Sequence, residues 1–195
     1  DVSYDAAACL PVAYGTAVRM MHSVGEVKQG DKVLILGASG GVGTCCVQLA
    51  KLRGAEVIAC ASSESKLARL KDLGAAHLLD YTKHDFVTWV YETFGKPHRR
   101  KFTGGVDVVV NFTGGETWVP SLKVLHRGGK VLTCGATAGF DPKEDLRFIW
   151  TFELKILGAN GWMREDLLTL LTLIQQGRLR PVIDCELPLE EVNEA

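Results

Sequence analysis

The sequence predicts an α/β fold, a doubly wound Rossmann sheet of six parallel strands with helices on both faces. Short apolar runs such as 32–37 and 56–61 show no polar alternation, which is typical of parallel strands covered on both faces. Segments of helical periodicity follow these runs in regular succession. Strands and helices that alternate in this way indicate βαβ crossover units.

Start and stop signals place the elements along the chain. Asp5 is the predicted N-cap of an apolar helical stretch over 6–21, which Pro11 divides. Ser63 begins a later helix and Gly74 ends it. Strands are expected at 32–37, 56–61, 77–80, 106–111, 129–133 and 154–158. The other helices are expected at 44–52, 86–94, 118–125 and 164–176.

The composition excludes several classes of protein. With 47% apolar and 23% charged residues, the chain is ordinary for a soluble globular protein. A net charge of -1 argues against a nucleic-acid or membrane-surface partner, because both need a basic excess. No apolar run approaches the ~20 residues of a membrane span. Six scattered cysteines without a CxxC pair indicate reduced thiols and a cytoplasmic setting.

A glycine-rich turn, Gly37-Ala38-Ser39-Gly40-Gly41-Val42-Gly43, leaves the first predicted strand and opens a helix. Such a turn lets a pyrophosphate approach backbone N–H groups at the positive end of the helix. Ala38 stands at the usual first glycine, and Gly40 and Gly43 at the second and third. A turn that serves packing alone is the alternative. Its position within successive strand–helix units favours a dinucleotide site.

The tip of the second strand favours NADP over NAD. An NAD site places a carboxylate there for the ribose hydroxyls, whereas this chain has Ala61, followed by Ser62 and Ser63. Hydroxyl donors and Lys66, one turn further on, would accept a 2′-phosphate. Glu64 works against this interpretation unless its side chain points to solvent. An ordinary helix cap with a solvated lysine is the alternative.

The ordered set of motifs resembles the medium-chain dehydrogenase/reductase family, and within it the zinc-free quinone oxidoreductase branch. The matching segments span essentially the whole chain: 10–17 (LPVAYGTA), 37–43, 74–77 (GAAH), 105–109 (GVDVV), 128–131 (GGKV) and 177–183 (GRLRPVI). The resemblance implies a cofactor domain that follows a GroES-like catalytic domain, which lies outside this chain. We therefore expect a helical lead-in at 1–28, an NADP-binding domain at 29–184 and a return segment at 185–195. Leu189, Val192 and Ala195 recur there at helical spacing, and we expect that segment to be truncated.

The resemblance also assigns site residues. In this branch, residues placed like Lys66 and Tyr81 contact the 2′-phosphate, and a threonine placed like Thr16 lies near the nicotinamide. Other candidates follow strands at the carboxyl edge, where sheets of this type bind ligands. The expected cofactor contacts are Thr16, Ala38, Ser39, Gly40, Gly41, Val42, Gly43, Ser62, Ser63, Lys66, Tyr81, Asn111, Phe112, Thr113, Gly135, Ala136, Thr137 and Asn160.

We expect no metal site in this chain. Zinc-dependent relatives carry a cysteine ligand where this chain has Val12, and Cys9 is out of register and predicted to be a buried helix residue. The five histidines show no paired metal-ligand spacing. No general acid stands out, and Tyr14 and Thr16 are the weak catalytic candidates.

Hydride transfer from NADPH to a quinone, an enone or another activated carbonyl is the reaction that the resemblance implies. Three alternatives stay open: a zinc-type alcohol dehydrogenase with upstream ligands, a non-catalytic NADPH-binding structural or sensor protein, and, ranked low, a methyltransferase on a similar sheet. A homodimer is expected through the edge strand near Ile156 and Leu157, because such edges pair between subunits in this family.

Overall fold

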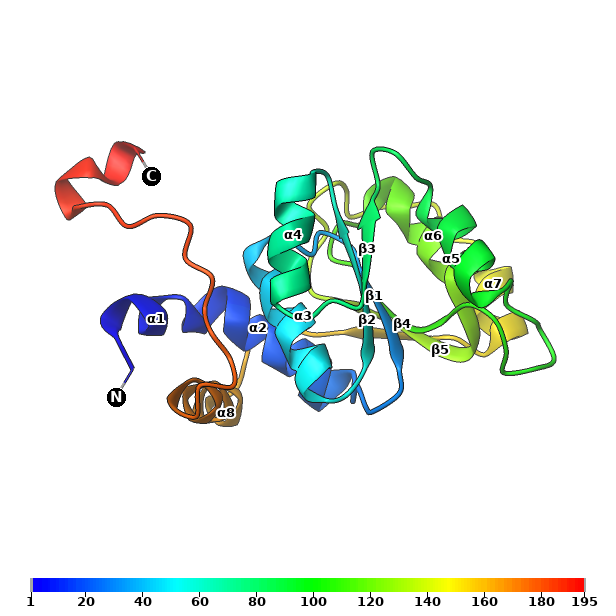
Figure 1. Cartoon of the computed structure of the whole chain (residues 1–195). Helices are drawn as coiled ribbons and strands as arrows, with labels where there is room; N and C mark the ends of the chain where they lie inside the picture. Colours follow the sequence, from blue (N-terminus) through cyan, green and yellow to red (C-terminus); the bar gives the residue numbers. More distant parts are fainter. Residues whose placement is uncertain (1, 195) are drawn as a thin grey trace.

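The computed structural model describes residues 2–194 and is built on one six-stranded sheet (Figure 1). The strand order is β3-β2-β1-β4-β5-β6, and every pair of neighbours is parallel. The strands are β1 (Lys32–Ile35), β2 (Glu56–Ala61), β3 (His77–Asp80), β4 (Val106–Val110), β5 (Leu125–Thr133) and β6 (Lys155–Gly158). Because the order reverses between β1 and β4, the sheet is doubly wound. The predicted fold class is confirmed.

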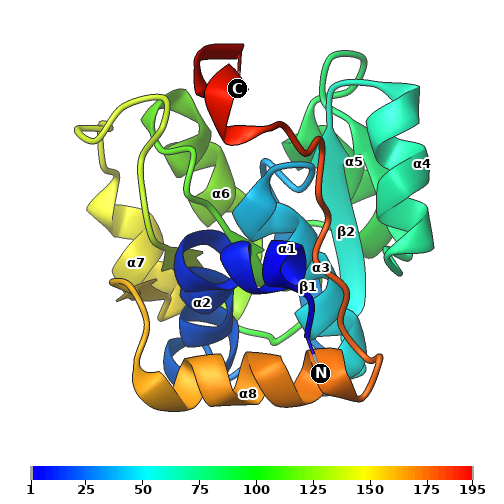
Figure 2. The same cartoon turned by 90° about the vertical axis from the view of Figure 1, so that its left-hand side faces the viewer.

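Helices cover both faces of this sheet. On one side lie α2 (Gly15–Val18), α3 (Gly41–Leu52), α4 (Glu64–Asp72) and α8 (Arg164–Gln175). On the other lie α5 (Phe86–Phe94), α6 (Trp118–Val124) and α7 (Leu146–Phe152). Short segments complete the chain: α1 (Tyr4–Ala8), the π-helical turns η1 (Leu10–Tyr14) and η2 (Arg19–Val24), and the 3-10 segments η3 (Gly115–Thr117) and η4 (Leu189–Glu194). Helix α8 packs across α2 at the edge of the molecule (Figure 2).

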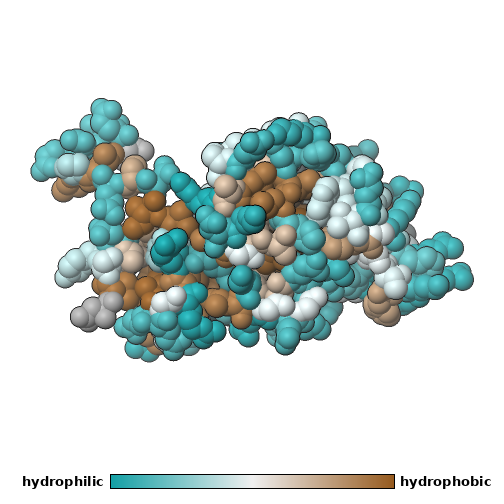
Figure 3. Space-filling model, viewed as in Figure 1, coloured by the Kyte–Doolittle hydropathy of each residue, from teal (hydrophilic) through white to brown (hydrophobic). Residues whose placement is uncertain are grey.

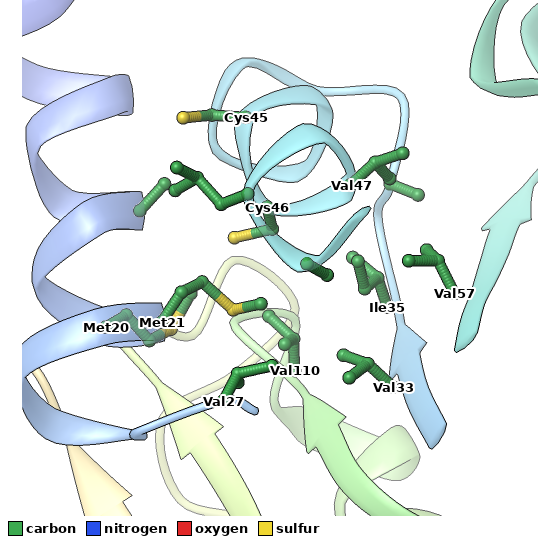
Figure 4. Close-up of a cluster of buried hydrophobic side chains, with 14 of the residues drawn as sticks. Met20, Met21, Val27, Val33, Ile35, Cys45, Cys46, Val47, Val57 and Val110 are labelled. Atoms are coloured by element: carbon green, nitrogen blue, oxygen red, sulfur yellow. The ribbon is translucent and has the colours of Figure 1, made fainter. Parts of the chain in front are cut away.

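The core divides into two layers because strand side chains alternate between faces. In β1, Val33 and Ile35 belong to the cluster under α2 and α3, whereas Leu34 belongs to the cluster under α5 and α6. Both clusters contain fully buried residues. Figure 4 shows the first layer, where Met20 and Met21 of η2 meet Cys46 of α3 above the sheet. A sheet covered on both faces explains the unbroken apolar runs of the sequence.

The amino-terminal helix begins earlier than predicted. Ser3 is the N-cap, with extended backbone angles, and its Oγ accepts a hydrogen bond from the N–H of Ala6 at 3.2 Å. Asp5 lies within the first turn of α1 instead. The prediction of Asp5 as N-cap was therefore wrong, because two capping residue types stand close together and the first one is used. Cys9 is only half-buried between α1 and η1, so its assignment as a buried helix residue was also wrong.

Other differences concern where elements begin. Helix α3 begins at Gly41 rather than Thr44, with Gly40 as its N-cap. Strand β5 follows α6 without a loop and so begins at Leu125 instead of residue 129. Helix α7 was not predicted; Asp145 caps it by accepting from the N–H of Arg147 at 3.1 Å. The domain division at 28 and 184 stays a prediction, as does the dimer. Strand β6 has one unpaired edge within the described sheet, and the side chain of Ile156 is exposed there.

An ionic pair joins β4 and β5 near their amino ends. His126 Nε2 lies 2.7 Å from Asp107 Oδ1, and Asp107 Oδ2 accepts from the N–H of Lys32 at 2.8 Å. The hydrogen bond to Asp107 raises the pKa of His126 against the effect of burial. Burial opposes the shift at Asp107, but the hydrogen bonds from His126 and Lys32 lower the pKa of Asp107 overall.

This pair predicts a pH-dependent contribution to stability. The contribution of His126 to the free energy of unfolding is complete below the unfolded pKa of about 6.5. It is lost as the pH rises through the raised pKa of His126 in the folded chain. The contribution of Asp107 is present above its unfolded pKa of about 3.9. It is lost as the pH falls through the lowered pKa of Asp107 in the folded chain. Urea denaturation should therefore show that His126→Gln costs about 1 kcal/mol more near pH 6 than near pH 9. An equal cost at both pH values would contradict this account.

Candidate functional site

The glycine-rich turn 37–43 lies between β1 and α3 and is pinned to the strands on either side. The N–H of Leu36 donates to Val110 O at 3.1 Å, and the N–H of Ala38 donates to Cys60 O at 3.2 Å. Gly43 has no room for a side chain, because a Cβ there would lie 2.4 Å from Gly37 O and 2.6 Å from Ala38 Cα. At Gly40 a Cβ would meet nothing closer than Gly37 O at 3.6 Å. The turn is therefore closed on its sheet side and open on its outer side.

Unpartnered donors lie at this opening. Among the residues that the structure describes, the N–H groups of Gly41 and Val42 have no protein acceptor. Both belong to the first turn of α3, a twelve-residue helix whose positive dipole end faces the same space. This donor set fits a pyrophosphate, since anions bind helix amino termini through such N–H groups.

A cavity of about 270 Å³ adjoins the turn and brings together residues from three parts of the chain. It is lined by Ser39, Gly40, Gly41, Thr44, Lys66, Arg69, Leu70, Val182 and Asp184. Lys66 and Arg69 come from α4, three residues apart and so on one helix face. Val182 and Asp184 come from the segment after α8, which Figure 2 shows in orange and red running up past α3 and α4. Four of the predicted contacts, Ser39, Gly40, Gly41 and Lys66, are thus gathered in one place.

The predicted 2′-phosphate residues gather at the carboxyl ends of β2 and β3. The N–H of Tyr81 donates to Ala61 O at 3.2 Å, which places Tyr81 beside the end of β2. Ser63 caps α4, and its Oγ accepts from the N–H of Lys66 at 3.4 Å. The ring of Tyr81 is 53% exposed and Lys66 is exposed, so both side chains are free to meet a ligand. Ser62 is half-buried.

The charge of Glu64 is turned away from this cavity. Its Oε1 accepts from Lys83 Nζ at 3.3 Å, and Lys83 also lies 3.3 Å from Asp80 Oδ2. Hydrogen bonds to Glu64 and Asp80 raise the pKa of Lys83. Glu64, the residue that argued against a phosphate site, therefore pairs with Lys83 and lies outside the lining of the cavity.

A second group of predicted residues joins the ends of β4 and β5. The N–H of Thr137 donates to Phe112 O at 3.1 Å, and the N–H of Ala138 donates to Thr113 O at 2.7 Å. Gly135 and Ala136 line a separate cavity of about 350 Å³, together with Trp118 and Glu144. The structure therefore brings the loops 111–115 and 135–139 together at the carboxyl edge of the sheet.

Asn111 differs from its neighbours in this group, because its side chain is used inside the fold. Its Nδ2 donates to Thr117 Oγ1 at 3.1 Å and to Ser121 Oγ at 2.9 Å. Its Oδ1 accepts from the N–H groups of Thr113 at 3.0 Å and Gly114 at 2.9 Å. The residue is fully buried. Asn111 holds the turn after β4, and any contact to a ligand would come from Phe112 or Thr113.

Tyr14 is unsuited to acid–base chemistry. Its side chain is 2% exposed, and its hydroxyl accepts from the N–H of Val182 at 2.9 Å while donating to Arg180 O at 3.4 Å. Burial raises the pKa of Tyr14. Gln48 holds the same segment through both its amide atoms. These contacts argue against the candidate catalytic role of Tyr14, because its hydroxyl anchors the segment after α8.

The remaining predicted contacts lie on α2 and after β6. Thr16 is half-buried on α2, and Asn160 is exposed just beyond β6. The two segments touch, since a Cβ on Gly15 would lie 2.8 Å from the indole ring of Trp162. No hydrogen bond of the described residues involves either side chain, so both are free to meet a ligand.

Five residues of the cavity were missed from sequence: Thr44, Arg69, Leu70, Val182 and Asp184. Arg69 had a local signal, because it follows Lys66 at helical spacing. Asp184 had none, since only the return of the chain past α3 brings it there. Between residues 2 and 194, no three His, Cys, Asp or Glu residues form a group suited to a metal ion. The described helices are also too short or too polar to cross a membrane.

Comparisons with known proteins agree with this geometry. Crotonyl-CoA reductase of Streptomyces avermitilis is 32% identical over 206 residues, across 100% of this chain and 46% of its own length. Quinone oxidoreductase of Mus musculus is 28% identical over 96% of this chain and 56% of its own length. The solved structure of the 2-octenoyl-CoA carboxylase reductase CinF, in complex with NADP and 2-octenoyl-CoA, has a TM-score of 0.88 at 30% identity. That match covers 99% of this chain and 46% of CinF.

The chain thus spans about half the length of the relatives it matches. A family model described as zinc-binding dehydrogenase matches residues 41–176, from the glycine-rich turn to the end of α8. Because this match takes in more than half of the chain, the chain belongs to the zinc-binding dehydrogenase family, and the predicted membership of the medium-chain dehydrogenase/reductase superfamily is confirmed.

Proposed function

We propose that this chain is the NADPH-binding part of an oxidoreductase that transfers hydride to a conjugated carbonyl compound. One observation carries the proposal: Gly41, whose N–H group is unpartnered like that of Val42 beside it, lines a cavity that also holds Lys66 and Arg69. A diphosphate at the turn and a further phosphate beside α4 would satisfy these donors and cations together. The NADP complex named for CinF, which matches this chain across its length, supports the same cofactor.

The residues of this chain would bind and orient the cofactor. The turn 37–43 would hold the diphosphate, and Ser62, Ser63, Lys66 and Tyr81 would surround the 2′-phosphate. Thr16, Phe112, Thr113, Thr137 and Asn160 would position the nicotinamide end along the carboxyl edge of the sheet. Bound there, the dihydronicotinamide supplies the hydride, and the protein contributes orientation and exclusion of water.

A conjugated acceptor does not require a metal ion. Hydride addition to a simple ketone builds charge on one oxygen, which a Lewis acid would stabilise. A quinone, an enone or an enoyl thioester spreads that charge over a conjugated system, so hydrogen bonds suffice. Two relatives support this class by name, a crotonyl-CoA reductase and a quinone oxidoreductase. A zinc-type alcohol dehydrogenase is the second candidate, which the description of the family favours. Metal analysis of the intact protein would separate the two.

A further domain would complete the enzyme. Apolar side chains are exposed at the end of the molecule that carries both termini, among them Tyr4, Val12, Leu189 and Val192. Figure 3 shows hydrophobic surface at this end, over α1 and α2 and on the segment after α8. Such a surface fits contact with the catalytic domain that the family places upstream.

The experiment that tests the proposal is calorimetric titration of this chain with NADPH and NADH. We expect NADPH to bind more tightly, and Lys66→Met to reduce its affinity about tenfold, because a lysine–phosphate contact is lost. The affinity for NADH should change less than twofold. Lys71→Met is the matched control on α4, since Lys71 is also exposed but does not line the cavity. Equal affinity of the unmodified chain for the two cofactors would overturn the NADPH assignment.

A further inference from the structure

An acidic residue lies in the same cavity as the cations proposed to hold the cofactor. Asp184 Oδ1 lies 3.9 Å from Arg69 Nη1, with side chains 93% and 57% exposed. The only charged residues among those that line the cavity are these two and Lys66, so the formal charge of the lining is +1. Without Arg69 the charge of Asp184 would cancel that of Lys66. The balance between the charges of Arg69 and Asp184 therefore affects how strongly the cavity attracts a phosphate.

Asp184 reaches the cavity because its segment is fixed a few residues earlier. Tyr14 and Gln48 hold residues 180 and 182 through backbone hydrogen bonds of 2.9–3.4 Å. Two residues further on, Asp184 faces α4. This arrangement places a carboxylate opposite Arg69 of α4, although the end of β2 has no carboxylate.

We propose that Arg69 and Asp184 are specificity-determining residues that set the preference for NADPH over NADH. The proposal rests on the proposed function of the chain. Asp184 lowers the affinity for a 2′-phosphate, because it repels a dianion that binds beside Lys66. Arg69 offsets this repulsion and adds a second cation. NADH has hydroxyl groups in place of that phosphate, so neither residue affects it strongly.

The expected size of the effect follows from Coulomb's law. Two unit charges about 4 Å apart in water change an equilibrium constant by roughly fivefold. A dianion at about twice that distance gives a similar change. An exposed ionic pair contributes little to folding by itself, so substitutions at either residue should leave the fold intact.

The test is a double-mutant cycle on the full chain, with NADPH and NADH titrated by calorimetry at low salt. We expect Asp184→Asn to raise the affinity for NADPH roughly fivefold and Arg69→Met to lower it by a similar factor. The double variant restores the original lining charge and should return to within about twofold of the unmodified chain. The two single variants and the double variant should bind NADH with an affinity within about twofold of that of the unmodified chain. They should also melt at the same temperature as the unmodified chain. Raising the ionic strength to about 1 M should shrink both single effects.

Glu186→Gln is the matched control, because Glu186 is an exposed carboxylate on the same segment that does not line the cavity. It should leave the NADPH affinity unchanged. The inference fails if the unmodified chain prefers NADPH but Asp184→Asn leaves the ratio of the NADPH and NADH affinities unchanged. It also fails if Glu186→Gln raises this ratio as much as Asp184→Asn does. A chain that binds neither cofactor would instead overturn the proposed function, so the two failures are distinguishable.

Discussion

Gly43→Ala is expected to destabilise the chain by about 3 kcal/mol and to abolish binding of NADPH. The new methyl group would lie 2.4 Å from Gly37 O and 2.6 Å from Ala38 Cα, where only backbone atoms could move aside. The turn would have to open, and α3 would lose its packing against β1. Urea denaturation and calorimetric titration with NADPH measure the two effects.

Gly40→Ala is the matched control within the same turn. Its backbone angles of φ -78° and ψ 174° are allowed for alanine, and its Cβ would meet nothing closer than 3.6 Å. Stability should therefore stay within about 0.5 kcal/mol of the parent. Because the second glycine of such a turn admits the pyrophosphate, the affinity for NADPH should still fall. A Gly43→Ala chain with parental stability would show that the turn has room for a methyl group at Gly43, against the 2.4 Å approach to Gly37 O.

Asn111→Ala is expected to lower the free energy of unfolding by about 3 kcal/mol. Its amide makes four hydrogen bonds of 2.9–3.1 Å inside the fold, and two of them satisfy the N–H groups of Thr113 and Gly114. Their loss leaves buried polar groups without partners and releases the turn after β4. Chemical denaturation measures this cost directly.

The control for this prediction is Asn160→Ala, which removes an exposed amide just after β6 and should leave stability unchanged. If Asn111 contacted the cofactor instead of holding the turn, Asn111→Ala would weaken binding of NADPH without changing the unfolding curve. That outcome would contradict the structural role assigned to Asn111.

Most strands and central helices could be predicted because their signals are local. β2, β3 and α5 have the predicted bounds. β2 and β3 are short apolar runs, and α5 is an amphipathic stretch between clear capping residues. The helical stretch up to Val24 could not be divided correctly, because π-helical turns interrupt it and its largely apolar sequence gives no sign of them. α7 escaped prediction for another reason. None of its residues is fully buried, and only Phe148 and Phe152 pack against the cluster under α5 and α6, so its core face is too short to mark a helix.

The candidate site shows the same division between local and distant signals. The glycine-rich turn, Ser63 and Lys66 are readable from neighbouring residues, and the structure places the turn and Lys66 on one cavity. Tyr14 looked like a candidate acid because sequence shows a hydroxyl but not its partners. Those partners, Arg180 and Val182, come from the far end of the chain. Asp184 could not be predicted for the same reason, because the residues that it meets in the cavity are distant from it in sequence.

A crystal structure of this chain grown with NADPH tests the central claim most directly. The account predicts that oxygens of the diphosphate accept hydrogen bonds from the N–H groups of Gly41 and Val42. It also predicts that the 2′-phosphate lies beside Lys66 and Tyr81. Electron density for the cofactor elsewhere on the molecule, or a turn filled by protein side chains at saturating NADPH, would contradict it.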